Sequence, residues 1–190
     1  MVLDLPPVPA LDAEAVLAAA AVRDRLPVGA LGVWASVIDL LAGSRGPGDG
    51  PLLPHPRLTV FAADHAVAQA AISAAPASQS VARAVELATG LGLAAGLARH
   101  SGVGVNVVDV GLAVPDPAVP DRLAQARPAG RIDRSDALTE DELAAAVQAG
   151  RDQADAAVDS GADLLVGATC GVGVSTPVAA WVVTVGAASV

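Results

Sequence analysis

The feature that most constrains this 190-residue chain lies near its end, where an aliphatic run leads into a glycine-rich turn. Residues 162–177 read ADLLVGATCGVGVSTP, which predicts a buried strand, a turn and the start of a helix. Unpaired amides and the helix dipole at such a turn both favour a phosphate. The predicted phosphate-binding residues are Gly171, Gly173, Ser175 and Thr176. A glycine-rich turn without a ligand would show the same pattern, and the lysine of a P-loop is absent.

From residue 57 onward, short aliphatic runs alternate with alanine-rich helical stretches. The runs predict strands at 58–62, 105–110 and 163–167. The stretches between them predict helices over 78–99 and 139–160, and a last helix from Thr176-Pro177. Repeated strand–helix units of this kind predict an α/β fold: an open parallel sheet with helices on both faces, a Rossmann-like three-layer arrangement.

The beginning of the chain has a different texture. Residues 13–26 and 33–42 predict two helices, and the spacing of four apolar residues predicts the inward face of the second: Trp34, Val37, Ile38 and Leu41. A loop rich in Gly and Pro follows at 43–56. Length by itself favours one domain, but the change of texture near residue 50 separates a helical region over 1–50 from an α/β region over 51–190.

Composition excludes several functional classes. The net charge is −9, and all 11 basic residues are arginines without a cluster or stripe, so nucleic acid is disfavoured as a partner. The single cysteine, Cys170, excludes an intramolecular disulfide and a cysteine-based zinc cage. The acidic start lacks the basic region of a secretory signal, which predicts a cytoplasmic location. No cofactor or metal is predicted.

The uncharged stretch 164–190 is long enough to raise the alternative of a membrane span. Glycines, two hydroxyl residues and Pro177 interrupt it, and a span tolerates these only with compensating partners. A buried strand followed by a buried helix is the better interpretation, so no membrane is predicted as a partner.

Polar residues lie after the first predicted strand and within the second. Asp64 and His65 come directly after the first strand, at the edge where ligands bind in open parallel sheets. Asp109 lies within the second strand and is predicted to face its end or to pair across the sheet. A structural alternative is that Asp64 caps the next segment and His65 is a polar loop residue.

Five collinear segments together resemble the nicotinate-nucleotide:dimethylbenzimidazole phosphoribosyltransferases of cobalamin assembly. They are PVGALG at 27–32, DHAV at 64–67, AISAAP at 71–76, VVDVG at 107–111 and ATCGVGVSTP at 168–177. The family has KPPGSLG, DHGV, GVSxxP, VVDVG and GEMGIGNTTP in the corresponding places. The likeness spans essentially the whole sequence.

The resemblance implies a pentosyltransferase that moves the ribose phosphate of nicotinate mononucleotide onto 5,6-dimethylbenzimidazole, giving α-ribazole 5′-phosphate and nicotinate. Such a reaction needs an anion site, an apolar slot for a flat base and a carboxylate base. The glycine-rich turn would supply the anion site, and Asp64, His65 and Ser73 would line the slot for the flat base. The family's catalytic glutamate lies in a C-terminal half beyond Val190, so no catalytic residue is assigned here.

Several positions depart from the family pattern. The loop glutamate is replaced by Thr169 and the loop asparagine by Val174. Ala66 stands for a glycine, the early lysine is absent, and the expected glutamine of the helix falls near Ala82 or Arg83. These differences describe a divergent relative whose turn has lost its acid and its amide.

The resemblance further implies that residues 1–50 are the N-terminal helical segment of a small accessory domain and that residues 51–190 are an α/β substrate-binding domain. It also implies that the sheet of the family continues past this chain. The apolar residues of the last helix would then lack their cover, at a cost of several kcal/mol for a few hundred Å². We therefore expect a homodimer or a partner chain that supplies the missing C-terminal half. Two alternatives stay open: a non-catalytic nucleotide- or benzimidazole-binding or regulatory relative, and one half of a split transferase.

Overall fold

The computed structural model describes residues 7–46, 53–123 and 128–187. By its internal contacts the chain divides into two compact units, Met1–Leu53 and Pro54–Val190.

The first unit is a pair of helices, α1 (Ala13–Arg23) and α2 (Trp34–Arg45). Asp12 caps α1, because its side chain accepts a hydrogen bond from the Ala15 N–H at 2.9 Å. The prediction of a helix over 13–26 was three residues too long, since the chain turns after Arg23. The predicted inward face of α2 was also wrong in part: Trp34 and Val37 are 62% and 38% exposed.

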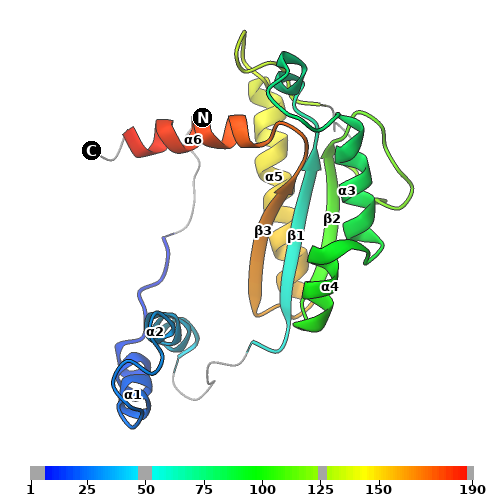
Figure 1. Cartoon of the computed structure of the whole chain (residues 1–190). Helices are drawn as coiled ribbons and strands as arrows, with labels where there is room; N and C mark the ends of the chain where they lie inside the picture. The colour runs from blue at the N-terminus through cyan, green and yellow to red at the C-terminus, as the bar shows by residue number, and fades with distance from the viewer. Residues whose placement is uncertain (1–6, 47–52, 124–127, 188–190) are drawn as a thin grey trace. The chain divides into compact units, whose positions relative to one another are not determined.

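The second unit contains a three-stranded parallel sheet in the order β2-β1-β3 (Figure 1). The strands are β1 (Pro56–Ala63), β2 (Gly104–Gly111) and β3 (Leu164–Cys170). The α/β prediction is confirmed. The third strand runs three residues further than predicted, because β1 continues to pair with it as far as Cys170. The turn after it is correspondingly shorter.

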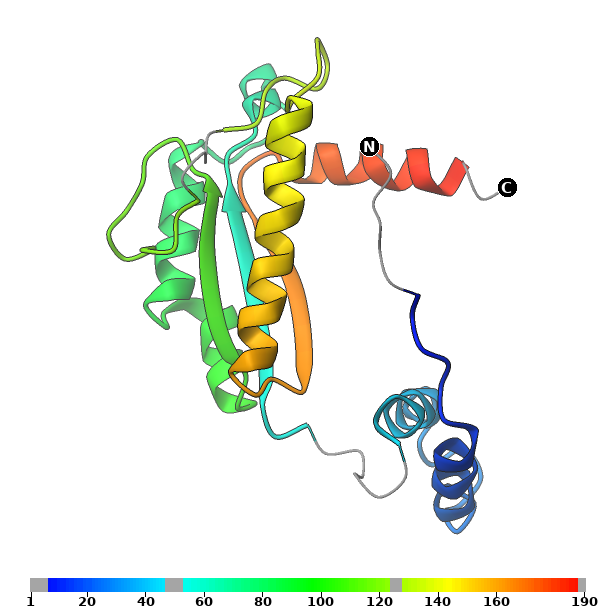
Figure 2. The same ribbon diagram turned by 180° about the vertical axis from the view of Figure 1, so that it is seen from behind.

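Helices cover both faces of this sheet. Figures 1 and 2 show α3 (Ser78–Ala88) and α4 (Gly92–His100) on one face and α5 (Glu140–Asp159) on the other. A short 3₁₀ helix, η1 (Ala66–Ala70), follows β1, and α6 (Ser175–Ala187) follows β3. The predicted capping box of α5 is confirmed, since Thr139 and Glu142 exchange hydrogen bonds.

The predicted single helix over 78–99 is instead two helices. Gly90 and Gly92 adopt φ values of +75° and +77°, which an α-helix cannot contain and which glycine allows at little cost. Among the described residues, Ser78–His100 is the one helical segment with the length and hydropathy of a membrane span. The chain breaks within it, however, and both halves bury alanines in the fold, at Ala84, Ala95 and Ala98. The other apolar stretch, from residue 164, forms a strand and the 13-residue helix α6.

The hydrophobic core lies between the sheet and α3. Its buried members come from β1, β2, α3 and the connection after β2: Val60, Ala62, Ala84, Val107, Leu112 and Val119. That connection also covers the outer edge of β2, because the Asp109 N–H donates to the Asp121 carbonyl at 2.7 Å and the Leu123 N–H donates to the Asp109 carbonyl at 3.0 Å.

The opposite edge of the sheet, formed by β3, is exposed. In β3, Leu164, Leu165 and Val166 are 37–43% exposed. In α6, Trp181 is 67% and Val183 is 70% exposed. An apolar strand edge and helix with this exposure are surfaces that other polypeptide normally covers.

Candidate functional site

The candidate site lies where the carboxyl ends of β1 and β3 meet. These strands are neighbours, and helices on opposite faces follow β1 and β2. In open parallel sheets, ligands bind in the crevice beyond the strand ends where the connections diverge. Two segments meet at this edge: residues 64–70 after β1 and the turn 171–174 after β3.

Both glycines of the turn are required by its close approach to the segment after β1. A Cβ on Gly171 would lie 1.9 Å from the Ala63 carbonyl oxygen, which is an impossible contact. Gly173 has a φ of +83°, and a Cβ there would lie 3.0 Å from the Ala68 side chain. Glycine at these positions is therefore explained by packing, whatever ligand the turn holds.

Helix α3 anchors the turn through a hydroxyl. The fully buried Ser80 accepts a hydrogen bond from the Val172 N–H at 2.9 Å. This contact joins residues 92 positions apart, and the prediction from sequence did not include Ser80.

Replacing Ser80 with alanine should destabilise the protein by about 1–3 kcal/mol, because the buried Val172 N–H would lose its acceptor. The control is Ser78→Ala in the exposed first turn of the same helix, which should change stability by less than about 0.5 kcal/mol. Urea unfolding followed by circular dichroism measures both. Equal effects of the two substitutions would show that the Ser80 contact does not hold the turn.

The next amides of the turn have no acceptor within the described residues. The Thr176 N–H donates to the Gly173 carbonyl at 3.2 Å, and the Val178 N–H donates to the Val174 carbonyl at 3.2 Å. For the N–H groups of Gly173, Val174 and Ser175, the described part of the chain provides no acceptor. These N–H groups lie just before α6 or at its first residue. The partial positive charge at the N-terminus of the helix therefore adds to the positive charge of the N–H groups themselves.

Asp64 has a structural role at this edge. Its side chain is buried, and its Oδ2 accepts a hydrogen bond from the Ala113 N–H at 2.9 Å. Its backbone N–H donates to the Gly111 carbonyl at 3.0 Å, and its carbonyl accepts from the Ala129 N–H at 3.0 Å. Asp64 thus ties the end of β1 to the end of β2; it does not cap the next segment, since the N-cap of η1 is His65 and no side chain caps that helix.

His65 and Ser73 lie on the same connection as Asp64. Burial lowers the pKa of His65, while the Asp64 carboxylate opposes this effect, so the imidazole is neutral at pH 7. The Ser73 Oγ accepts a hydrogen bond from the Ala75 N–H at 3.2 Å, a local turn contact.

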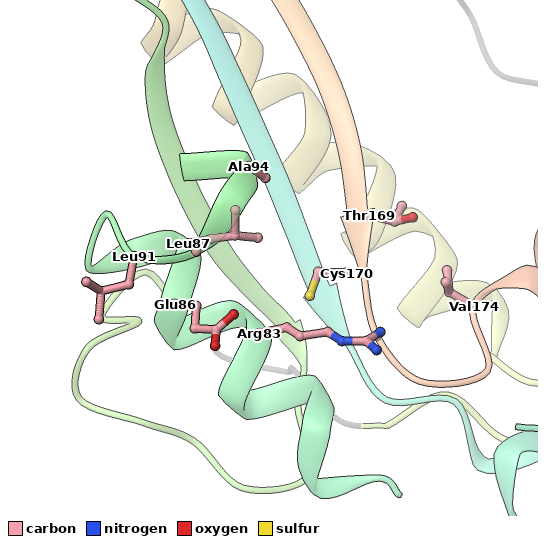
Figure 3. Close-up of a pocket in the computed structure, with 10 residues that line it drawn as sticks. Arg83, Glu86, Leu87, Leu91, Ala94, Thr169, Cys170 and Val174 are labelled. Carbon is pink, nitrogen blue, oxygen red and sulfur yellow. The ribbon is translucent and has the colours of Figure 1, made fainter. Parts of the chain in front are cut away.

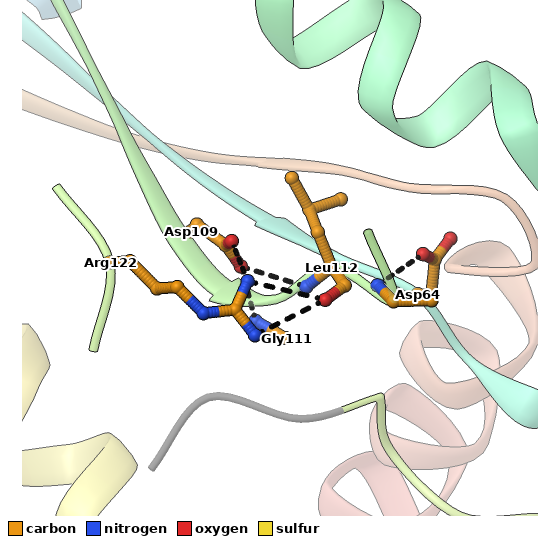
Figure 4. Close-up of polar contacts among 6 residues, drawn as sticks. Asp64, Asp109, Gly111, Leu112 and Arg122 are labelled. Atoms are coloured by element: carbon orange, nitrogen blue, oxygen red, sulfur yellow. Dashed lines mark hydrogen bonds and ion pairs between the residues drawn. The ribbon is translucent and has the colours of Figure 1, made fainter. Parts of the chain in front are cut away.

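Asp109 stabilises the loop that follows β2. It is 1% exposed, and its Oδ1 accepts hydrogen bonds from the N–H groups of Gly111 and Leu112 at 3.0 and 2.8 Å. Its Oδ2 forms an ion pair with Arg122, which also donates to the Leu112 carbonyl (Figure 4). The Asp109 side chain is thus committed to the loop and to Arg122.

A cavity of about 300 Å³ lies between α3, the start of α4 and the turn after β3 (Figure 3). Its wall is mostly apolar, and its two charged side chains are Arg83 and Glu86. The lining residues are Arg83, Glu86, Leu87, Leu91, Gly92, Ala94, Thr169, Cys170, Gly171 and Val174. The residues predicted to form the base pocket, Asp64, His65 and Ser73, are not among these, although Gly171 and Val174 of the turn are.

Electrostatics link this cavity to Asp64. Burial raises the pKa of the Cys170 thiol, the Arg83 guanidinium lowers it, and the Asp64 carboxylate raises it. The sulfur in Figure 3 points toward the Arg83 side of the cavity. Arg83 and Asp64 therefore both act on a group in the cavity wall. Among the described residues, no cluster of three or more His, Cys, Asp or Glu side chains is placed to bind a metal.

The contribution of α3 to this site was missing from the prediction. The signal was present, since Ser80, Arg83 and Leu87 recur at spacings of three and four and so share one face of the helix. Two polar residues on a face that packs against a sheet indicate contacts beyond the core. The sequence prediction placed the base pocket at the end of the first strand, because ligands bind beyond the strand ends of open parallel sheets.

Comparisons with known proteins agree with one another. A family model described as "Phosphoribosyltransferase" matches residues 8–190. The nicotinate-nucleotide–dimethylbenzimidazole phosphoribosyltransferase of Mycobacterium ulcerans (strain Agy99) is 37% identical over 178 residues, covering 91% of this chain and 49% of the relative. The enzyme of the same name from Corynebacterium efficiens is 38% identical over 154 residues, covering 81% of this chain and 41% of the relative.

A solved structure has the same fold. The crystal structure of the protein of this name from Thermus thermophilus superposes with a TM-score of 0.76 at 29% identity, covering 86% of this chain and 50% of that one. The chain spans about half the length of the curated relatives it matches.

Proposed function

The chain belongs to the phosphoribosyltransferase family of these relatives, and on that premise we propose that it takes part in nicotinate-nucleotide:dimethylbenzimidazole phosphoribosyl transfer. The reaction moves ribose 5-phosphate from nicotinate mononucleotide to 5,6-dimethylbenzimidazole and forms α-ribazole 5′-phosphate, a step of cobalamin nucleotide-loop assembly. The chain supplies the part that binds the small-molecule substrates. The cytoplasmic location stays a prediction.

The observation that carries this proposal is the position of the 171–176 turn. It presents three N–H groups without an acceptor in the described chain, at Gly173, Val174 and Ser175, and it also forms one wall of the apolar cavity. A phosphate on the turn would leave the attached ribose beside the cavity. Ser175 and Thr176 add hydroxyl groups that can donate to the phosphate.

The flat base occupies the cavity in this proposal. Leu87, Leu91, Ala94 and Val174 provide the apolar contacts that a benzimidazole or pyridine ring needs. Asp64, His65 and Ser73 support this pocket from the segment after β1 and remain predictions as base-pocket residues. Asp64 does so by holding the strand ends together, through its contact with Ala113.

We also propose that further polypeptide, corresponding to the half of the relatives that this chain does not cover, completes the enzyme. The open edge of β3 and the exposed apolar residues of α6 support this view, because a further strand and helices would cover them. The carboxylate base of the reaction would come from that polypeptide, since Thr169 cannot act as a carboxylate base.

The test is to incubate the purified chain with nicotinate mononucleotide and dimethylbenzimidazole and to measure nicotinate and α-ribazole 5′-phosphate by chromatography. A parallel reaction contains a second polypeptide carrying the C-terminal half of a relative such as that from Mycobacterium ulcerans. We expect micromolar nucleotide binding by the chain alone and product only in the second reaction.

A non-catalytic binding relative is the second candidate, favoured by Thr169 and Val174 in place of the family's loop acid and amide. Binding of either substrate without product in both reactions would support it. Absence of both binding and product would overturn both candidates.

A further inference from the structure

The link between α3 and α4 forms one rim of the cavity. Leu91 and Gly92 lie in the cavity wall, and so does Ala94 in the first turn of α4. Leu91 is nevertheless 62% exposed, and in Figure 3 its side chain points away from Cys170. An apolar side chain in water beside an apolar cavity gains free energy by turning into it. The structure therefore shows this rim in an open arrangement.

The backbone on both sides of Leu91 allows the side chain to turn. Gly90 and Gly92 have φ values of +75° and +77°. Glycine passes between positive and negative φ without the penalty that a Cβ imposes. The atoms nearest to a Cβ built at these glycines belong to side chains, the Arg99 Nη1 at 3.7 Å for Gly90 and the Glu86 Oε2 at 3.3 Å for Gly92. Flexible side chains of this kind can move together with the link.

The helices on either side of the link are fixed elsewhere. Helix α4 is anchored by the buried residues Ala95 and Ala98, and α3 is anchored by Ala84. The N-cap of α4, Leu91, provides no side-chain hydrogen bond to the first N–H groups of the helix. An exposed segment between two anchored elements opens at low cost. Residues 90–92 can therefore move while both helices keep their packing.

One side chain holds the link from the other end of α4. The Arg99 Nη1 donates to the Gly90 carbonyl at 3.2 Å, and this contact is exposed. We propose that residues 90–92 form a gate over the cavity, in which Leu91 turns inward and the Arg99 contact holds the open arrangement. A few residues that absorb a change of φ and ψ are sufficient for such a motion. The inference goes beyond the proposed function and does not depend on it, because it concerns access to the cavity.

Alkylation of Cys170 by iodoacetamide measures the position of the gate. Cys170 is the only cysteine of the chain and lies in the cavity wall, so the reagent reaches it through the cavity. Among the described residues, the charged groups that shift the pKa of this thiol are Arg83 and Asp64. Replacing Arg99 or Leu91 therefore changes access to the thiol and leaves its ionisation as it is.

Arg99→Gln should slow alkylation about three-fold, because the loss of one hydrogen bond shifts the link toward the closed arrangement. Adding Leu91→Ala to this variant should restore the wild-type rate, since the side chain that covers the cavity is then gone. The matched control adds Leu93→Ala instead. Leu93 lies in the first turn of α4 and is 81% exposed, but it does not line the cavity, so this double variant should remain slow.

Leu91→Trp tests the gate with Arg99 intact. The larger side chain should cover more of the cavity and slow alkylation about two-fold. Circular dichroism checks that each variant is folded, and if Arg99→Gln is not, the rate of Leu91→Trp decides. The inference is overturned by an unchanged or faster rate in folded Arg99→Gln, by equal restoration with Leu93→Ala and Leu91→Ala, or by an unchanged rate in Leu91→Trp. No substrate takes part, so the result is separate from that of the transfer assay.

Discussion

Replacing Gly171 with alanine is expected to destabilise the protein by about 3 kcal/mol or more, or to prevent folding of the Pro54–Val190 unit. The new Cβ would lie 1.9 Å from the Ala63 carbonyl oxygen, far inside contact distance. Both atoms are fixed by the backbone, so no side-chain rotation can relieve the clash. The turn would have to move away from the end of β1.

The matched control is Gly167→Ala in β3, the strand that leads to the same turn. A Cβ on Gly167 would meet nothing within 4 Å, so this substitution should change stability by less than about 1 kcal/mol. Urea denaturation followed by circular dichroism compares the two variants. If Gly171→Ala were as stable as Gly167→Ala, the close approach of the turn to β1 would be wrong.

Replacing Asp109 with alanine is expected to cost about 3–5 kcal/mol. The substitution removes the acceptor of the Gly111 and Leu112 N–H groups and the partner of Arg122 together. With the carboxylate at 1% exposure, water cannot fully replace these contacts. The effect should extend to the edge of β2, which the segment carrying Arg122 covers.

A surface ion pair provides the comparison. Asp133 pairs with Arg131 at 40% exposure, and the Asp133→Ala variant should lose much less stability, because water solvates both partners of an exposed pair. The free energies of unfolding of both variants come from the same denaturation experiment. A loss at Asp109 no larger than that at Asp133 would contradict the structural role assigned to the buried pair.

The pattern of short aliphatic runs was sufficient to predict the strands, because a strand buried in a parallel sheet must be apolar on both faces. The predicted ends of the strands and helices were less accurate. β3 extends to Cys170 through pairing with β1, which the local pattern of residues 168–170 does not encode. The break between α3 and α4 was underestimated, since Gly90 and Gly92 tolerate a helix as well as the positive φ that they adopt.

The candidate site was predicted only in part. The 171–176 turn was recognised because its glycines, hydroxyls and proline are neighbours in the sequence. Ser80 and Glu86 were not recognised, and Arg83 was noted only near the position of the family's glutamine. The packing of α3 on the sheet brings this helix beside the turn across about ninety intervening residues. Asp64 and Asp109 were noted as polar residues at strand ends, but their bonds to Ala113, Gly111 and Leu112 depend on how the strands pair.

By itself, the sequence determined the α/β class, the strand–turn–helix unit and the family, because these depend on residue type and local order. The tertiary structure decided which residues share the cavity and why Gly171 must lack a side chain. It also decided which apolar surfaces remain uncovered on β3 and α6. The physical reason is that contacts between distant segments are set by the register of the sheet and by the face that each helix presents to it. One helix face thereby brought Ser80 and Arg83 to the turn that the sequence had already marked.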